Sequence, residues 1–424
     1  MSATHFSPFE TRLGDLDTFA DGPPYELYAR MREEAPVMWT EAPSDWPEVD
    51  QPGFWSVTRA EHVEQVSKDP VTFSSWLGGF AMRADEVGSL EVARSVMIGK
   101  DGDEHARMRG TVNKAFTPWR VRNLAPSVRQ HVTHTIESAL AGGECDLVLD
   151  LAAPVATTTV ADLLGVPEED RAQLNRWTDA FLSADDDVAG GMRGDEAMAA
   201  VGQYLMGLLM ERAERPAEDL ITALGLAAYD GRAMPVEEQI GVFAQLFAAG
   251  IDSTKSTICN GILTLTGHPD QLALVRGDPG LVCGAVEEIL RWRPPFTHQR
   301  RTATRDTELG GQQIGQGESV VMWLQSSSRD PRAIARPDVF DITRGAAQCP
   351  HQAFGGGGRH FCIGAGLARL ELITFFEEFL SRVDAVVLTG RPERIRSCFV
   401  DGYKRVPVRL ARTRHPSLSV PVEA

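Results

Sequence analysis

The chain has 424 residues, of which 43% are hydrophobic and 24% charged, and its formal net charge is −17. This composition supports a sizeable folded core, and the acidic balance disfavours nucleic acid or an anionic membrane as a partner. The N-terminal stretch is polar and acidic, so we expect neither a signal peptide nor a membrane anchor, and we expect a cytoplasmic protein. No linker-like segment divides the chain, which predicts a single domain over residues 1–424.

Helical periodicity dominates and predicts a mainly α fold with a minor β part. In the first third, a strand is expected at 54–58, and helices at 24–34, 60–68, 103–116 and 125–141. Residues 74–102 are dotted with glycine and predict a loop with short helical pieces.

The middle of the chain is predicted to be helical, with helices at 152–164, 168–183, 196–215, 220–226 and 235–267. The last of these is the longest, and Pro235 suits its first turn. The acidic, glycine-containing segment 185–195 is the expected mobile loop. A helix at 279–291 then ends at Pro294 and Pro295. After it we expect strands at 298–304, 307–309 and 319–324, and a final helix from Cys362 to about 383.

Six cysteines occur without a CxxC pair, which disfavours a zinc site, a disulfide scaffold and an iron–sulfur cluster. Cys362 differs from the other five because it follows the glycine run 355–358 and opens a helical segment. Free N–H groups and the positive end of a helix favour a thiolate there, which is a metal ligand or a nucleophile. Glycines let a flat group approach the backbone, so haem with one axial cysteine is favoured. The alternative is a glycine-rich turn with an inert cysteine.

The run 354–364 resembles the haem-binding loop of the cytochrome P450 monooxygenases, Phe-Gly-x-Gly-x-His-x-Cys-x-Gly. His360, Cys362 and Gly364 match, whereas an extra glycine moves Phe354 one residue further from the cysteine. The resemblance implies the P450 fold, with haem b between the long distal helix and the helix after the cysteine loop. It also implies that Cys362 is the axial iron ligand.

The run 247–254, Phe-Ala-Ala-Gly-Ile-Asp-Ser-Thr, places small and polar residues inside an apolar helix. Gly250 costs about 1 kcal/mol relative to alanine. Either a ligand against the helix or a close helix–helix crossing would explain it. The run is similar to the oxygen-activation motif of the family, which implies a catalytic set of Asp252, Ser253 and Thr254. Ser253 replaces the usual threonine, so we expect proton delivery to persist with looser coupling of electrons to product.

Two further sets match the family in weaker ways. Glu288 and Arg291 resemble its Glu-x-x-Arg structural pair, although a solvated surface pair is the alternative. The usual third partner stands just before Phe340, where this chain has Val339, so it is unassigned. Cofactor-binding donors for the haem propionates are expected, in the family's order, at His105, Arg109, Arg301 and His360.

The resemblance also implies an apolar substrate pocket, in which His298 is considered as a hydrogen-bond donor. Its expected walls are Phe80, Met82, Phe243, Phe247, Ile251, Phe296, Thr297, Phe399 and Val400. For the aromatic residues, an ordinary place in the core is the alternative. No flavin- or nicotinamide-binding segment is present. Electrons are therefore expected from a ferredoxin or flavodoxin with its NAD(P)H-dependent reductase, docking near Arg107, Arg359 and Arg369.

The activity implied by the resemblance is insertion of one oxygen atom of O2 into a C–H bond of an apolar small molecule, such as a steroid, terpenoid, branched lipid or polyketide. Residues 53–58, residues 300–306 and the lengthened glycine loop look like the bacterial branch that oxidises steroids and methyl-branched lipids. A peroxide-driven oxygenase or isomerase is one alternative. Others are a haem-thiolate sensor, which the proton-relay set of Asp252, Ser253 and Thr254 disfavours, and a helical protein without haem.

Overall fold

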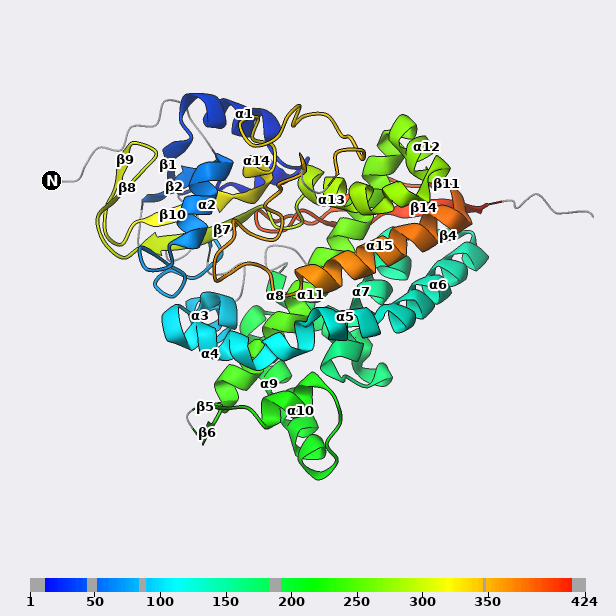
Figure 1. Ribbon diagram of the computed structural model, residues 1–424, viewed down its shortest axis with the longest axis horizontal. Coiled ribbons are helices and arrows are strands. Elements are labelled where there is room, and N and C mark those ends of the chain that lie inside the picture. Colours follow the sequence, from blue (N-terminus) through cyan, green and yellow to red (C-terminus); the bar gives the residue numbers. More distant parts are fainter. Residues whose placement is uncertain are drawn as a thin grey trace, which may run out of the picture.

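The computed structural model describes residues 12–43, 52–83, 89–182, 192–229, 231–345 and 348–413. Helices fill most of this part of the molecule, and the largest sheet lies at one side of it (Figure 1). The longer helices are α1 (Tyr25–Glu34), α2 (Ala60–Lys68), α4 (Gly102–Asn113), α6 (Ala125–Gly142), α7 (Ala153–Leu164), α8 (Arg171–Leu182), α9 (Gly194–Glu214), α11 (Val236–Gly267), α12 (Pro269–Gly277), α13 (Val282–Trp292) and α15 (Ala365–Arg382). The shorter ones are α3 (Leu90–Ser95), α5 (Pro118–Asn123), α10 (Leu220–Gly225) and α14 (Leu324–Ser327).

The largest sheet has five strands in the order β1-β2-β10-β7-β3. These are β1 (Val37–Glu41), β2 (Gly53–Val57), β10 (Ser319–Trp323), β7 (His298–Ala303) and β3 (Phe73–Ser74). β2 and β10 pair in parallel, and the other neighbours pair antiparallel. A second sheet joins β11 (Val383–Leu388), β14 (Pro407–Arg412) and β4 (Glu144–Asp146). The two-stranded ribbons are β5 (Ala228–Tyr229) with β6 (Arg232–Ala233), β8 (Thr307–Leu309) with β9 (Gln312–Ile314), and β12 (Glu393–Arg394) with β13 (Tyr403–Arg405).

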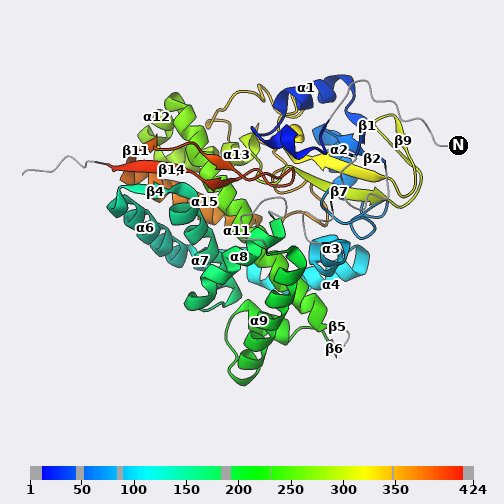
Figure 2. The ribbon, with the colours of Figure 1, turned by 180° about the vertical axis from the view of Figure 1, so that it is seen from behind.

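The long helix α11 crosses the centre of the molecule (Figures 1 and 2). It packs against α7, α8 and α9, and also against α13 and α15. Its residues from Val242 to Ile251 belong to one apolar cluster, and those from Ile258 to Leu265 belong to a second. The polar residues 252–257 therefore lie where the two clusters meet. The rest of the helix is apolar because it is packed inside the molecule.

The glycine run before Cys362 packs against the last turn of α2. Gly355, Gly357 and Gly358 have φ values of +93°, +95° and +74°, a region that favours glycine. A Cβ on Gly358 would lie 2.6 Å from the Ser67 carbonyl oxygen. The prediction explained these glycines by a flat ligand alone, but the turn geometry and the contact with α2 also require them.

The predicted helices are confirmed, with ends displaced by a few residues, and the predicted strands appear as β2, β7, β8 and β10. Most of the predicted mobile loop, residues 185–191, lies outside the described residues, and Gly194 and Asp195 open α9. Prediction missed β1, α5 and α12. Four of the five residues of β1 are buried, so it lacks the alternation that signals a strand. Within the described part of the chain, one stretch, Leu147–Leu164, is long and apolar enough to cross a membrane, but 67% of it is buried inside the fold, as in a core helix.

Candidate functional site

Cys362 opens into a cavity between α11 and α15. Its N–H donates to the Phe354 carbonyl at 3.0 Å, and α15 begins three residues later, so the cysteine precedes the first turn that was predicted to hold it. Burial raises the pKa of the Cys362 thiol, while the Gly364 N–H, Arg109 and Arg369 lower it. The predicted stabilisation of the thiolate is thus present but outweighed. A coordinated metal ion would supply the missing positive charge.

The four predicted propionate donors converge on one edge of this cavity. His105 and Arg109 come from α4, Arg301 from β7, and His360 from the cysteine loop. The rings of His105 and His360 lie 4.2 Å apart. Burial lowers the pKa of His105 to about 4, that of His360 to about 2 and that of Arg301 to about 10, so at neutral pH the histidines are uncharged donors beside a cationic arginine.

This basic edge fits the carboxylates of an anionic cofactor. The buried Nδ1 of His360 has no hydrogen-bond partner in the protein. Within the described cavity wall, Glu371 is the sole acid, and it does not come from this edge. No group of three or more metal-ligating side chains occurs among the described residues, so an iron ion here would need ligands from a macrocycle besides Cys362. A single thiolate, a basic edge and otherwise apolar walls together match haem.

One face of α11 lines the cavity with residues spaced four apart, namely Gln245, Ala249 and Ser253. The Ser253 hydroxyl donates to the Ala249 carbonyl at 2.6 Å, and the Thr257 hydroxyl donates to the Ser253 carbonyl at 2.7 Å. Thr254 also lines the wall. The predicted hydroxyls therefore face the space that the cofactor and substrate would share.

Asp252 does not line the cavity with Ser253 and Thr254, the residues with which it was predicted to relay protons. Its side chain is buried, and Oδ1 lies 3.0 Å from the Lys255 ammonium. Lys255 also donates to Asp179 of α8 at 3.1 Å. Burial lowers the pKa of Lys255, but the two carboxylates outweigh it and leave that pKa above its usual value. Asp252 thus belongs to a buried charge cluster on the opposite side of α11.

The structure supports both explanations that the sequence allowed for Gly250, a close helix–helix crossing and a ligand lying against the helix. A Cβ at this position would lie 2.8 Å from a methyl group of Val160 on α7, which shows a close helix crossing. Gly250 and Val160 also line the cavity. The small residue is therefore needed by the crossing and leaves room for a ligand.

Glu371, on α15, is a site residue that prediction missed. Burial raises the pKa of its carboxyl group well above the usual value, and a hydrogen bond with Thr159 offsets this only in part. Oε1 is buried without a partner in the protein, and the residue lines the cavity. The only sequence signal was a glutamate in an apolar helical segment.

A second cavity adjoins the first, and the structure brings only part of the predicted substrate wall to it. Phe80, Phe296 and Phe399 line this chamber. Phe243, Phe247 and Ile251 instead lie in the apolar cluster behind the wall, because they project from other faces of α11. Met82, Thr297 and Val400 are also buried away from both cavities.

His298 is not a donor to a substrate, because both of its ring nitrogens are engaged. Nε2 accepts the Met82 N–H at 2.9 Å, and Nδ1 lies 3.2 Å from the Cys398 carbonyl. Burial lowers the pKa of His298 to about 3, so the ring stays neutral and Nδ1 carries the proton. The residue ties the loop that carries Phe80 to the C-terminal turn that carries Phe399.

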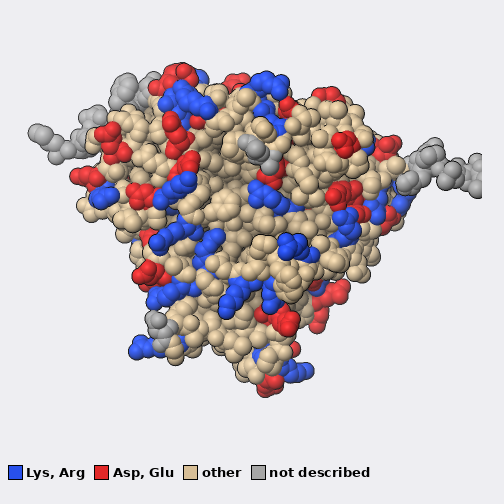
Figure 3. Space-filling view, in the orientation of Figure 1, with Lys and Arg blue, Asp and Glu red and all other residues tan. Residues whose placement is uncertain are grey.

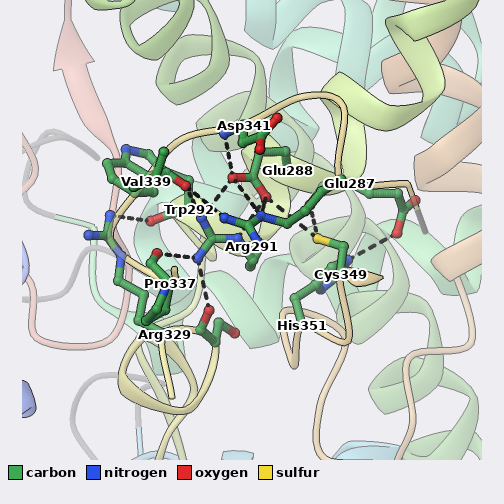
Figure 4. A network of polar contacts seen from close by, with 12 residues as sticks. Glu287, Glu288, Arg291, Trp292, Arg329, Pro337, Val339, Asp341, Cys349 and His351 are labelled. Atoms are coloured by element: carbon green, nitrogen blue, oxygen red, sulfur yellow. Dashed lines mark hydrogen bonds and ion pairs between the residues drawn. The ribbon is translucent and has the colours of Figure 1, made fainter. Parts of the chain in front are cut away.

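Glu288 and Arg291 form a fully buried pair with two hydrogen bonds of 2.7 Å, so the solvated alternative is wrong (Figure 4). The unassigned third partner is Arg344, whose guanidinium lies 3.4 Å from Glu288. It was missed because it follows Phe340 instead of preceding it. Arg291 also donates to the carbonyls of the 337–339 segment, as Figure 4 shows for Pro337 and Val339. The pair therefore holds in place the segment of the chain that leads to Cys362.

Of the three arginines expected to form a docking patch, Arg107 and Arg359 are exposed. Arg369 is not available in the same way, since it donates to Glu287 at 2.6 and 2.9 Å. Further exposed cations are Lys114, Arg120 and Arg122, in and beside α5. Figure 3 shows that Lys and Arg gather across the middle of the face on which α4, α5 and the cysteine loop lie.

The helical fold, the cysteine beneath a basic-edged cavity and the hydroxyl-bearing helix above it define a haem-thiolate enzyme. The model of the family described as "Cytochrome P450" matches residues 281–399. Cytochrome P450 126 of Mycobacterium tuberculosis is 37% identical over 94% of this chain and 97% of its own length. A steroid C26-monooxygenase of Rhodococcus jostii is 34% identical over 93% of this chain and 83% of its own. The crystal structure of Mycobacterium marinum CYP268A2 in complex with pseudoionone superposes with a TM-score of 0.89 at 32% identity, covering 96% of this chain and 100% of that one.

The chain belongs to the cytochrome P450 family, and it is a monooxygenase with a haem-thiolate cofactor. The predicted family, fold class, enzyme class and cofactor are therefore confirmed.

Proposed function

We propose that this monooxygenase hydroxylates an apolar small molecule of the steroid, terpenoid, branched-lipid or polyketide kind, in the cytoplasm. The observation that carries the proposal is the apolar chamber that opens onto the cavity above Cys362. The named relatives support the class, because one is a steroid monooxygenase and one was solved with pseudoionone, a terpenoid ketone.

In this proposal the chain's own residues bind, orient and protonate. Cys362 ligates the iron as thiolate, and His105, Arg109, Arg301 and His360 bind the propionates. The haem, when bound, would supply the activation of O2 for attack on a C–H bond. Ser253 and Thr254 hold protons at the cavity wall, with Asp252 behind them on α11. The chamber excludes water from the reacting carbon.

We propose that electrons come from a ferredoxin or flavodoxin that docks on the exposed cations Arg107, Lys114, Arg120 and Arg359. The chain carries a net charge of −17, so a local basic surface is needed to attract an acidic partner. Charge reversal at Arg120 should slow reduction by such a protein at low salt and leave reduction by dithionite unchanged. Turnover supported by peroxide alone, with no gain from a redox partner, would favour the peroxide-driven alternative.

The test of the cofactor site is the reduced, carbon monoxide-bound absorption spectrum of the purified protein. We expect the red-shifted Soret band of a thiolate complex, its loss in Cys362→Ala, and its retention in Cys283→Ala, a matched change at an exposed cysteine outside the cavity. A panel of sterols, terpenoids, branched lipids and polyketides is then screened for conversion from low to high spin. Retention of the thiolate band in Cys362→Ala would refute the assignment of the ligand.

A further inference from the structure

The apolar chamber has uncharged walls. It shares Ile98, Gln245, Ala249, Phe296 and Gln299 with the haem cavity. The rest of its described wall consists of Phe80, Val92, Ala93, Val96, Phe181, Met198, Ala244, Ala248 and Phe399. The chamber is therefore poorly suited to an anionic substrate, since a buried carboxylate needs a cationic partner.

Gln245 stands out on this wall as a polar side chain held in one orientation. Its Oε1 accepts the backbone N–H of Ile98 at 3.0 Å. All residues of α11 from Val242 to Ala248 are buried except Gln245, which is partly exposed. The exposed part of Gln245 therefore faces the cavities that it lines. With the carbonyl oxygen committed to Ile98, the amide nitrogen presents its two N–H donors to the ligand space.

Gln299 has a different position. It lies two residues before Arg301 on β7, and therefore on the same face of the strand. Both residues line the haem cavity, so Gln299 stands on the strand side with the propionate donor, across from α11. Gln245 is therefore the polar side chain that α11 contributes to the described wall of the chamber.

We propose that the Gln245 amide nitrogen hydrogen-bonds a neutral oxygen, a ketone or a hydroxyl, on an elongated apolar substrate. Gln245, Ala249 and Ser253 lie on one face of α11, one and two turns apart, which is about 6–12 Å along the axis. A substrate carbon held at the level of Ala249 to Ser253 would lie about 6–12 Å along the helix axis from the bound oxygen. This inference deepens the proposed function and rests on it. It names neutral oxygenated lipids or terpenoids as the class and excludes free carboxylic acids.

The test uses imidazoles that ligate the iron and carry a linear tail into the chamber. In one series a single carbonyl is moved along the tail, and the reference compound has only methylenes. We expect one intermediate carbonyl position to bind about tenfold more tightly than the reference in the wild type, measured by the Soret shift, as one matched hydrogen bond gives. A tail ending in a carboxylate should bind more weakly than the reference.

The Gln245→Leu and Gln245→Met variants should lose the carbonyl preference. Both also lose the acceptor for the Ile98 N–H, but damage to that loop would weaken the ketone and its reference alike, so the ratio of the two affinities isolates the amide. A preference that persists in both variants, the absence of any preferred position in the wild type, or tighter binding of the carboxylate would overturn the proposal. Failure of the proposed function looks different, because no compound of the sterol, terpenoid, branched-lipid and polyketide panel would then be hydroxylated, even though the imidazoles bind.

Discussion

The buried pair of Glu288 and Arg291 gives a prediction whose size follows from its contacts. Arg291 has no exposed surface, and it donates to both oxygens of Glu288 and to the carbonyls of Ser328, Pro337 and Val339. Arg291→Leu removes all five bonds. It leaves Glu288 with the Asp341 N–H at 2.8 Å and the more distant Arg344. Breaking one side of a buried ion pair costs about 3–5 kcal/mol.

Such a loss is a large part of the roughly 5–15 kcal/mol that holds a typical domain folded. Because the carbonyls belong to the segment that leads to Cys362, we expect Arg291→Leu to lower the thermal midpoint and to release haem during gel filtration. The matched control is Arg412→Leu, which removes an exposed ion pair with Glu137 and should cost about 1 kcal/mol or less. The double variant Glu288→Leu/Arg291→Leu should recover part of the loss, because it also removes the buried carboxylate that Arg291→Leu leaves with only the more distant Arg344. Equal stability of Arg291→Leu and Arg412→Leu would refute the reasoning.

Three further changes test the cavity wall. Ser253→Ala should raise peroxide release per NAD(P)H consumed, since it removes a hydroxyl from the wall, and unchanged coupling would contradict this. Glu371→Gln should become more stable relative to the wild type as pH rises above the ordinary Glu pKa of 4.5, because the native acid keeps a proton that the unfolded chain releases. Thermal midpoints of both proteins between about pH 5 and about pH 8 measure this gain. A difference in midpoint that does not change with pH would contradict the prediction. Gly250→Ala should lower the free energy of unfolding by about 1–3 kcal/mol through the contact with Val160. Adding Val160→Ala should recover this stability, as measured by denaturant titration. If the effects of the two substitutions simply add, the close helix crossing is not their cause.

Sequence reasoning located the elements of this site well where chemistry is carried by a local run. The cysteine loop, the long helix and the paired Glu288 and Arg291 are contiguous or nearly so, and periodicity shows which segments are helical. His105, Arg109, Arg301 and His360 were predicted from resemblance, and the structure does bring them to one edge.

The predictions that failed share a physical cause, because the sequence does not show in which direction a side chain points from its helix. Phe243, Phe247 and Ile251 occupy the right helix, but its whole circumference is apolar, so the pattern cannot tell the cavity face from the packed faces. The role predicted for Asp252, to relay protons with Ser253 and Thr254, stays a prediction; the local pattern could not show that Asp252 points away from the cavity, since adjacent residues on a helix point about 100° apart. Arg344 and Glu371 were missed because their importance arises from burial, which no local spacing reveals.

The positions on α11 also constrain how protons can reach the cavity. Asp252 is paired with Lys255, and Asp179 of the same cluster keeps 20% of its side chain exposed, so this cluster links the surface to the back of the helix. Ser253 faces the cavity, but its hydroxyl donates to Ala249, so it cannot pass a proton onward without rotating. Serine has no γ-methyl group to restrict that rotation, unlike threonine. A proton from the Asp252 side therefore needs both a broken ion pair and a rotated hydroxyl, whereas burial raises the pKa of Glu371 and favours its protonated form at the cavity wall.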